Sequence, residues 1–356
     1  MIYFQRKFVQ VGGSELFALN LINNLPNSYD FKIFTFFISD NFKNYLNNHF
    51  PDKIINSIEI LNFNPISKNF FLYKFIINRE KIFVTNYGLE ELAFLKLIIK
   101  IRSIYLAHDM IHFNEFYSYG NKSRLFIEYT IIKQKFLESF MNEIVVLTNK
   151  AKDDRKKAFN INCKVMSAAI NNIQIQEKNF DKKENINFLI ICRLEKKKNV
   201  DSLIKVWPSI YSLYSNSVLH IVGSGSQMNY LTDLANSLKC KNVNFYGFID
   251  DNKKKRLLKI SDVFYSLDKA DFDIVMYEAL SFGIPVVFNK EQEVDEILIE
   301  NDWLCSSSMS TQDLLESTIT ILQKNNKDIK ILDNTLKKYL FSEYSKKFKN
   351  ELLENI

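Results

Sequence analysis

The chain has 356 residues, 47% of them hydrophobic, and a net charge of +6 at neutral pH, so its length is more typical of two domains than of one. Its four cysteines form no CxxC pair, which excludes the spacing of a disulfide framework or of a zinc site. Because the first residues lack a signal-peptide pattern and no apolar run reaches the roughly 18 to 20 residues of a membrane span, we expect a cytoplasmic protein.

The first half of the chain alternates short apolar runs with longer stretches of helical periodicity. This pattern is typical of crossover helices that connect parallel strands. One such helix is expected in "SELFALNLINNL", residues 14–25. The expected strands are Ile2–Phe4, Phe31–Phe37, Ile82–Val84, Ile104–Ala107 and Ile144–Leu147.

A polar segment without clear periodicity, residues 171–185, separates this half from a second series of the same kind. The strands expected there are Phe188–Cys192, Val218–Val222, Val243–Tyr246, Val263–Ser266 and Pro285–Phe288. The predicted fold class is α/β, with two Rossmann-like doubly wound domains that face one another across a cleft. Ligands of such sheets bind at the carboxyl ends of the strands.

The segment "DFDIVMYEALSFGIPVV" predicts a helix over residues 274–282. Asp273 is a suitable N-cap, and Gly283 suits the position just after the helix. The N-terminus of this helix would favour an anion such as a phosphate. Glu278, within the helix, could accept hydrogen bonds from the two hydroxyls of a ribose, or it is a half-exposed glutamate of an ordinary amphipathic helix.

Two cations follow the first strand of the second half, in "ICRLEKKKNVDSL". Arg193 comes just after the strand and Lys198 just before the next helix. A guanidinium and an ammonium at this edge could bind a pyrophosphate and stabilise the charge of a departing nucleoside diphosphate.

Two glycine turns also precede helices. Gly223 lies in "IVGSGSQ", which lacks the third glycine of a dinucleotide fingerprint, and Gly12 and Gly13 lie in "QVGGSEL". Each turn allows backbone to approach a ligand closely, and each is also explained as a plain tight turn.

His108 follows the strand expected at Ile104–Ala107, and it could donate to a substrate hydroxyl or a phosphate oxygen, or make a structural hydrogen bond. Asp271 and Asp273 spell DxD, a motif that can hold a divalent cation. Because a cap explains Asp273 and the cations at 193 and 198 suffice for a diphosphate, we predict no metal.

In chain order, these motifs resemble the retaining nucleotide-sugar glycosyltransferases of family 4, which belong to the glycosyl transferases group 1 and have the GT-B fold. The resemblance is carried by "GGSE" at Gly12, "RLEKKK" from Arg193, "IVGSGS", "VNFYGFID" and "EALSFGIPVV" from Glu278. Its specific part is the C-terminal half.

The resemblance implies a role for each site residue. Arg193 and Lys198 would hold the donor diphosphate, Glu278 the ribose, the backbone near Phe248 the base, and His108 would lie beside the reacting sugar. The remaining donor-binding positions would be Gly12, Gly13, Gly223, Asp271, Phe272, Asp273 and Ile274. Neither a metal nor another cofactor would be needed, and a nucleoside-diphosphate sugar would be the co-substrate.

The chain departs from the family pattern in three places. The first glutamate of the family's paired acids is absent, and Ala270, Asp271, Phe272 and Asp273 stand where Glu-Gly-Phe-Gly is usual. The Pro-Asn-Gly near the domain junction is replaced by Ser167, Ala168 and Ala169, and "NKEQEVDEIL" replaces the Gly-Gly expected after "PVV".

The predicted function is the transfer of a hexose-type sugar from a nucleoside diphosphate to a glycan or lipid-linked acceptor, with retention of configuration. The alternatives are a non-catalytic nucleotide- or glycan-binding relative and a sugar-nucleotide epimerase of the same fold. Lysine-rich stretches could place the protein on the anionic inner face of the membrane, or they could attract an anionic acceptor by charge alone. Nucleic acid is not an expected partner.

The expected domains follow from this resemblance and from the polar segment. They are an acceptor-side domain at 1–170, a linker at 171–185, a nucleotide-sugar-binding domain at 186–335, and a C-terminal helix at 336–356 that packs back on the first domain.

Overall fold

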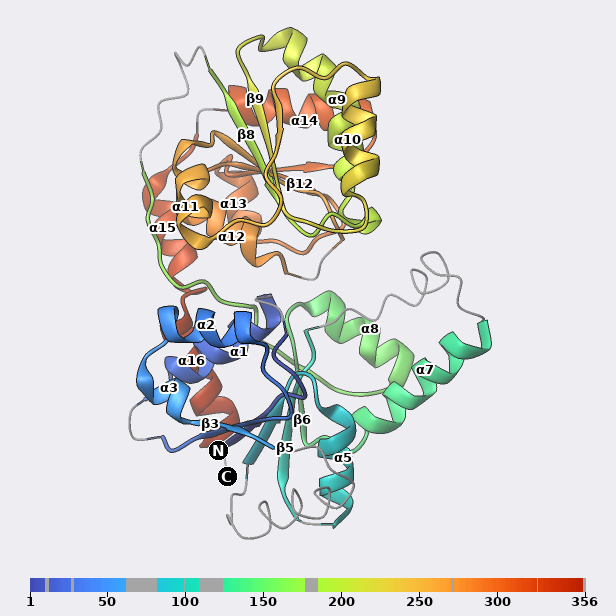
Figure 1. Cartoon of the computed structure of the whole chain (residues 1–356), viewed down its shortest axis with the longest axis vertical. Coiled ribbons are helices and arrows are strands. Elements are labelled where there is room, and N and C mark those ends of the chain that lie inside the picture. The colour runs from blue at the N-terminus through green and yellow to red at the C-terminus, as the bar shows by residue number, and fades with distance from the viewer. Residues whose placement is uncertain are drawn as a thin grey trace. The chain divides into compact units, whose positions relative to one another are not determined.

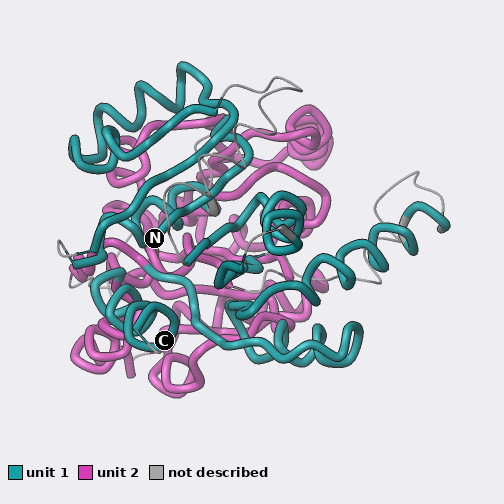
Figure 2. The backbone as a smooth tube through the Cα atoms, turned by 90° about the horizontal axis from the view of Figure 1, so that it is seen from below, with its two compact units in different colours: residues 1–169, 341–356 teal, residues 170–340 magenta. Residues whose placement is uncertain are grey.

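The structure is a computed structural model that describes residues 1–9, 13–26, 29–61, 82–98, 100–108, 124–176, 185–269, 272–324 and 326–354. It divides into two compact units, residues 1–169 with 341–356 and residues 170–340 (Figure 2). Each unit is an α/β sandwich whose strands are all parallel, as the alternation of strand and helix patterns predicts (Figure 1).

Unit 1 contains a sheet of seven strands in the order β3-β2-β1-β4-β5-β6-β7. The strands are β1 (Ile2–Phe4), β2 (Lys32–Thr35), β3 (Ile58–Ile60), β4 (Ile82–Thr85), β5 (Arg102–Leu106), β6 (Glu143–Val146) and β7 (Lys164–Val165). The helices are α1 (Gly13–Asn23), α2 (Asp40–His49), α3 (Asp52–Asn56), α5 (Leu89–Ile98), α7 (Arg124–Glu138), α8 (Asn149–Phe159) and α16 (Phe341–Phe348), which continues as a π-helical turn, Lys349–Leu353.

Unit 2 contains a sheet of six strands in the order β10-β9-β8-β11-β12-β13. The strands are β8 (Asn187–Ile191), β9 (Val218–Val222), β10 (Val243–Phe245), β11 (Val263–Ser266), β12 (Val286–Asn289) and β13 (Leu304–Ser307). The helices are α9 (Val200–Leu213), α10 (Met228–Ser237), α11 (Asp251–Ile260), α12 (Ile274–Ser281), α13 (Glu296–Glu300), α14 (Thr311–Gln323) and α15 (Ile329–Lys337), with a short 3-10 turn at Lys196–Lys198.

Helices cover both faces of the second sheet, and successive strand residues point to opposite faces. Phe188, Val263 and Tyr265 pack with α9, α10 and α14, whereas Leu189 and Phe264 pack with α11, α12, α13 and α15. Burial on both faces explains why these strands read as continuous apolar runs rather than as alternating patterns.

The ten expected strands all exist, with ends shifted by at most two residues. Three further strands, β3, β7 and β13, were not predicted. All three lie at a sheet edge, where one side of the strand has no neighbour to pack against. Their sequences are correspondingly short or polar, for example "KV" in β7 and "LCSS" in β13.

The expected linker and tail are divided differently by the structure. Ile173 and Ile175 pack on the core of unit 2, so the first part of the segment 171–185 belongs to that unit, and residues 177–184 lie outside the described part. Residues 336–340 also belong to unit 2, and the chain returns to unit 1 at Phe341. There α16 packs on α1, with Phe341 and Tyr344 against the ring of Phe17.

Candidate active site

The strand order of unit 2 fixes where a ligand site is expected. Connections from β8 run outward through β9 and β10 on one side, and β11 begins the series on the other side. The order reverses between β8 and β11, and doubly wound sheets bind ligands at the carboxyl ends of the two strands that flank this point. The loops that follow Ile191 and Ser266 are therefore the candidate site.

An ion pair joins these two loops. Lys198, from the loop and turn after β8, contacts the carboxylate of Asp268, two residues after β11. Both are largely shielded from water, with 21% of the Lys198 side chain and 8% of the Asp268 side chain exposed. Burial alone would lower the pKa of Lys198, but the charges of Asp268 and Asp273 outweigh it and raise that pKa, so the lysine stays a cation.

Asp273 is the N-cap of α12, as predicted, and its Oδ1 accepts a hydrogen bond from the backbone N–H of Val275 at 3.0 Å. Its Oδ2 accepts one from the hydroxyl of Ser266. Burial, and then the charge of Asp268, raises the pKa of Asp273, whereas Lys198 opposes this rise. Two carboxylates thus share one lysine at the carboxyl end of β11.

Three amide side chains hold this cluster in place, and none of them was among the predicted site residues. Gln292 Nε2 donates to the carbonyl of Asp268 at 2.8 Å and lies 2.9 Å from the hydroxyl of Ser266. Asn199 and Asn289 both donate to the carbonyl of Leu267, at 2.7 and 3.1 Å. Three side chains therefore fix the backbone at Leu267 and Asp268.

The other predicted cations and acids have separate partners. Arg193 is exposed and pairs with Glu195 at 3.0 Å, two residues along the same loop. Glu278 pairs with Lys254 of α11 at 3.1 Å, and both side chains are about one quarter exposed. The structure thus brings Lys198 and Asp273 together, whereas Arg193 and Glu278 each contact a residue outside that cluster.

Lys254 was not among the predicted site residues, and only 26% of its side chain is exposed. Burial would lower the pKa of Lys254, and the charges of Glu278 and Asp251 outweigh this and raise it. The spacing of Lys254 within a lysine run gave no signal of this contact, because the pairing depends on how α11 and α12 pack against the sheet.

The glycine turns are explained by close packing of loops. Gly223 has a φ of +131°, and a Cβ there would lie 1.8 Å from the carbonyl oxygen of Cys192. Its N–H donates to the carbonyl of Gly247 at 2.8 Å. The loops after β8, β9 and β10 therefore meet at this glycine, which places Phe248, 73% exposed, at the same end of the sheet as Lys198.

The last predicted residues of unit 2 lie against its apolar core. Phe272 stacks on Tyr277 with ring centroids 4.4 Å apart, and Ile274 packs against the same core. Asp271 lies outside the described residues, as do the preceding Ala270 and, in unit 1, Gly12.

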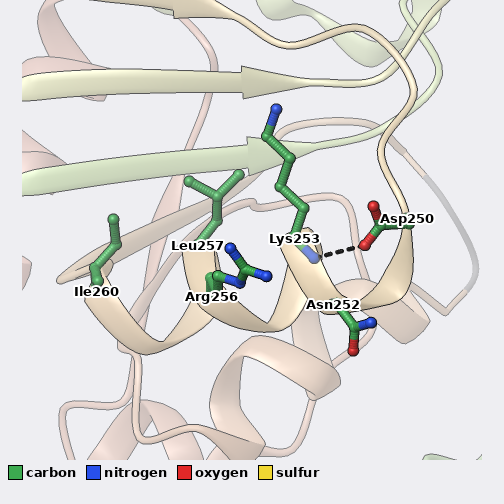
Figure 3. A pocket seen from close by; sticks show the side chains of 6 residues that line it. All are labelled: Asp250, Asn252, Lys253, Arg256, Leu257 and Ile260. Carbon is green, nitrogen blue, oxygen red and sulfur yellow. Dashed lines mark hydrogen bonds between the residues drawn. The ribbon is translucent and has the colours of Figure 1, made fainter.

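An open pocket of about 400 Å³ lies along α11 (Figure 3). It is lined by Asp250, Asn252, Lys253, Arg256, Leu257 and Ile260. None of these residues was a predicted site residue. Asp250 is occupied as the N-cap of α11, where its side chain accepts from the backbone N–H of Lys253 at 2.8 Å.

In unit 1, His108 follows β5, as predicted. Its ring meets Phe17 edge-on with centroids 4.6 Å apart, and burial together with the charge of Arg155 lowers its pKa to about 3. The imidazole is therefore neutral near pH 7. Gly13 begins α1, and a Cβ built on it would have no atom within 4 Å, so close packing within the structure does not require glycine there.

In the described ranges, no group of three or more His, Cys, Asp or Glu residues is placed to hold a metal ion. Among the helices of the same ranges, none is long and apolar enough to cross a membrane.

Known proteins resemble this chain in sequence and in fold. Residues 171–338, nearly the whole of unit 2, match the family model described as glycosyl transferases group 1. The chain has the GT-B fold. Over 99% of both chains it superposes on Anabaena HepE, solved with UDP and glucose, with a TM-score of 0.76 at 16% identity. WaaG, a glycosyltransferase involved in lipopolysaccharide biosynthesis, gives a TM-score of 0.67 at 16% identity over 99% of this chain and all of WaaG.

Two curated relatives match part of the chain. An uncharacterized glycosyltransferase of Haemophilus influenzae is 30% identical over 172 residues, which are 47% of this chain and 48% of the relative. A GDP-mannose-dependent mannosyltransferase of Corynebacterium glutamicum, which acts on a monoacylated phosphatidylinositol monomannoside, is 29% identical over 144 residues, 38% of each chain. The chain thus matches half or less of the length of these relatives. The match of the family model to unit 2 confirms the predicted resemblance to the glycosyl transferases group 1.

Proposed function

We propose that the protein is a retaining glycosyltransferase that moves a hexose-type sugar from a nucleoside diphosphate to a glycan or lipid-linked acceptor. The observation that carries this proposal is the Lys198–Asp268 pair at the point where the strand order of unit 2 reverses. A buried cation at this position can meet an anionic ligand without first being desolvated. HepE was solved with UDP and with UDP-glucose, and the Corynebacterium relative depends on GDP-mannose, which supports a nucleoside diphosphate as the donor's leaving group.

In this proposal Lys198 binds the donor diphosphate and stabilises the negative charge that develops as the sugar bond breaks. Asp268 orients the ammonium, and Asn199 and Gln292 orient the loop around Asp268. Arg193, exposed on a short loop, turns from Glu195 to the same diphosphate, and Glu278 accepts hydrogen bonds from the ribose. Because these cations neutralise the diphosphate, the reaction needs no metal or other cofactor.

The retaining step would occur on one face of the sugar. The acceptor hydroxyl attacks from the side on which the diphosphate leaves, and its proton passes to a leaving phosphate oxygen, so no side chain has to act as the base. Neutral His108 would donate a hydrogen bond to a sugar hydroxyl. Asp271, displaced by one residue from the family's usual acid, would select the donor sugar.

The proposed partners follow from the charge of the chain and from its relatives. A basic protein whose relative acts on a phosphatidylinositol derivative suits an acceptor at an anionic lipid surface. We place the protein in the cytoplasm, on the inner face of the membrane.

One observation favours a second candidate, a non-catalytic binding protein. The Asp273 carboxylate accepts a hydrogen bond from the N–H of Val275, one of the α12 backbone groups that a donor phosphate would use. Its negative charge at the N-terminus of α12 would also oppose a donor phosphate. The epimerase alternative has no contact in its favour.

A panel of nucleotide sugars tests the proposal. UDP-glucose, UDP-galactose, UDP-N-acetylglucosamine and GDP-mannose are each added at 1 mM, and the melting temperature is measured. One of them should raise it, because a ligand present at 100 times its Kd stabilises the folded state by about 2.7 kcal/mol.

The donor that binds is then incubated with and without lipid-linked acceptors, and release of the nucleoside diphosphate is measured. Binding without any release would make the protein a non-catalytic relative. Conversion of the donor sugar without acceptor would make it an epimerase. A panel in which no donor changes the melting temperature would contradict the proposal.

A further inference from the structure

Helix α7 of unit 1 carries a stripe of large apolar side chains that face solvent. Leu125, Tyr129, Ile132 and Phe136 follow one another at intervals of four, three and four residues, so they lie on one side of the helix. Between 60% and 78% of each residue is exposed. Such a contiguous apolar surface is rare on a monomeric protein and marks an interaction site.

The stripe continues onto α5, which packs against α7. Lys133 of α7 pairs with Glu90 of α5, so Glu90 marks the side of α5 that faces α7. Phe94 and Leu97 lie four and seven residues after Glu90, on the same side, and they are 54% and 65% exposed. We call these six apolar residues, Phe94, Leu97, Leu125, Tyr129, Ile132 and Phe136, the α5–α7 face.

The charge of the chain is concentrated in the unit that carries this face. Unit 1 holds 25 Lys and Arg against 18 Asp and Glu, a net charge of +7, whereas unit 2 holds 22 against 23, a net charge of −1. Lys133 and Lys135 lie on the two flanks of the α7 stripe. An apolar helix face between lysines, on a basic body, is the pattern of a helix that lies in the interface of an anionic bilayer.

A second copy of the chain is a poorer occupant of the same face. Pairing two α7 helices would bring two bodies of charge +7 together and would oppose lysine flanks of like sign. The phenol of Tyr129, in the middle of the stripe, would also enter a dry interface, whereas at a bilayer surface its hydroxyl reaches the headgroups.

We propose that the α5–α7 face is a docking surface for anionic lipid membranes. The apolar side chains of α7 enter the boundary between headgroups and acyl chains. Lys135 contacts a lipid phosphate, whereas Lys133 keeps its ion pair with Glu90. This surface deepens the proposed peripheral location and rests on it, since it would hold unit 1 where a lipid-linked acceptor emerges.

Flotation of the full chain with lipid vesicles tests the proposal. The vesicles contain either phosphatidylcholine alone or an equal mixture with phosphatidylglycerol. The wild-type chain should float with the anionic vesicles and bind neutral ones at least tenfold less. The double variant Ile132→Asn/Phe136→Asn should lose at least tenfold of the anionic binding.

Leu213→Asn/Tyr230→Asn is the matched control, since these side chains are 56% and 48% exposed on α9 and α10 of unit 2. The control should float like the wild type. Equal flotation of wild type and Ile132→Asn/Phe136→Asn, or absence of wild-type binding, would overturn the proposal. So would a dimer in light scattering that this variant converts to a monomer, because the occupant would then be a second copy.

The test also separates this inference from the proposed enzyme activity. Donor hydrolysis is measured without vesicles for the same proteins, and we expect the Ile132→Asn/Phe136→Asn variant to retain it. Vesicle binding in a protein that releases no nucleoside diphosphate would sustain the docking surface while contradicting the glycosyltransferase.

Discussion

Lys198 and Asp268 connect the loops that follow the two central strands, β8 and β11, of the second sheet. The pair is largely buried, and a buried charge that loses its partner costs about 3 to 5 kcal/mol of stability. Asp273 lies close enough to raise the pKa of the same lysine. The lysine therefore has a structural role in the fold and, in the proposed function, a catalytic role when a diphosphate is bound.

Lys198→Ala should lower the transfer rate by about 100-fold, the usual effect of removing a group that stabilises a developing anion. Lys196→Ala, in the same turn but exposed, is the matched control, and its transfer rate should stay within about twofold of the wild-type rate. Steady-state kinetics with the donor found in the nucleotide-sugar panel measures both.

Asp268→Asn, added to Lys198→Ala, separates the two roles of the lysine. The double variant should regain most of the melting temperature lost in Lys198→Ala, because the carboxylate that contacted the lysine is then a neutral amide. Its transfer rate should remain low. Recovery of transfer in the double variant would mean that Lys198 matters only for folding.

The sequence predicts the fold well because strands that are buried on both faces of a sheet have continuous apolar sequences. The edge strands β3, β7 and β13 escape that signal. Within the site, Asp273 was found as a cap because capping is local in sequence. Asp268 and Gln292 were missed because their roles depend on contacts between residues that are far apart in the sequence. Asp268 is 70 residues from Lys198, and Gln292 is 24 residues from Asp268.

The pairing of Glu278 with Lys254 gives a second prediction. Glu278→Gln should raise the KM for the donor about tenfold with a smaller effect on kcat, because a neutral amide accepts the ribose hydrogen bonds less strongly than a carboxylate. Glu300→Gln, at an exposed end of α13, is the control and should leave both constants unchanged. A larger fall in kcat than rise in KM would place Glu278 at the reacting bond instead of the ribose.

Lys254→Met tests whether the ion pair itself prepares Glu278. This change keeps the aliphatic stem but removes the cation 3.1 Å from the carboxylate. If Lys254 only positions Glu278, the double variant Glu278→Gln/Lys254→Met should bind donor no worse than Glu278→Gln alone. Additive losses would instead show that the two residues contact the donor independently.

Phe248 can be changed without disturbing the core, since 73% of it faces solvent after the sharp turn at Gly247, whose φ is +65°. Phe248→Ala should leave the free energy of unfolding within about 0.5 kcal/mol. If its ring stacks on the base, the KM for the donor should rise about tenfold, since stacking contributes about 1 to 3 kcal/mol per base. Leu238→Ala, also exposed, is the control; an unchanged KM in Phe248→Ala would leave only backbone contacts for the base.

His108 makes the stability of unit 1 depend on pH. Burial, and then the charge of Arg155, depresses its folded-state pKa to about 3, whereas an unfolded histidine titrates near 6.5. Between these values the unfolded chain binds a proton that the folded chain refuses. The free energy of unfolding should therefore be unaffected by this residue above about pH 7 and fall by up to about 1.4 kcal/mol per pH unit below about pH 6.

His108→Gln should remove this acid sensitivity, because an amide carries no charge at any pH. Urea unfolding followed by circular dichroism at pH 7.5, 6.0 and 5.0 measures the effect, and the stability of the variant should decline less steeply than that of the wild type. His49→Gln, exposed on α2, is the control and should follow the wild-type slope. Equal slopes in wild type and His108→Gln would show that the folded protein does not depress the pKa of His108.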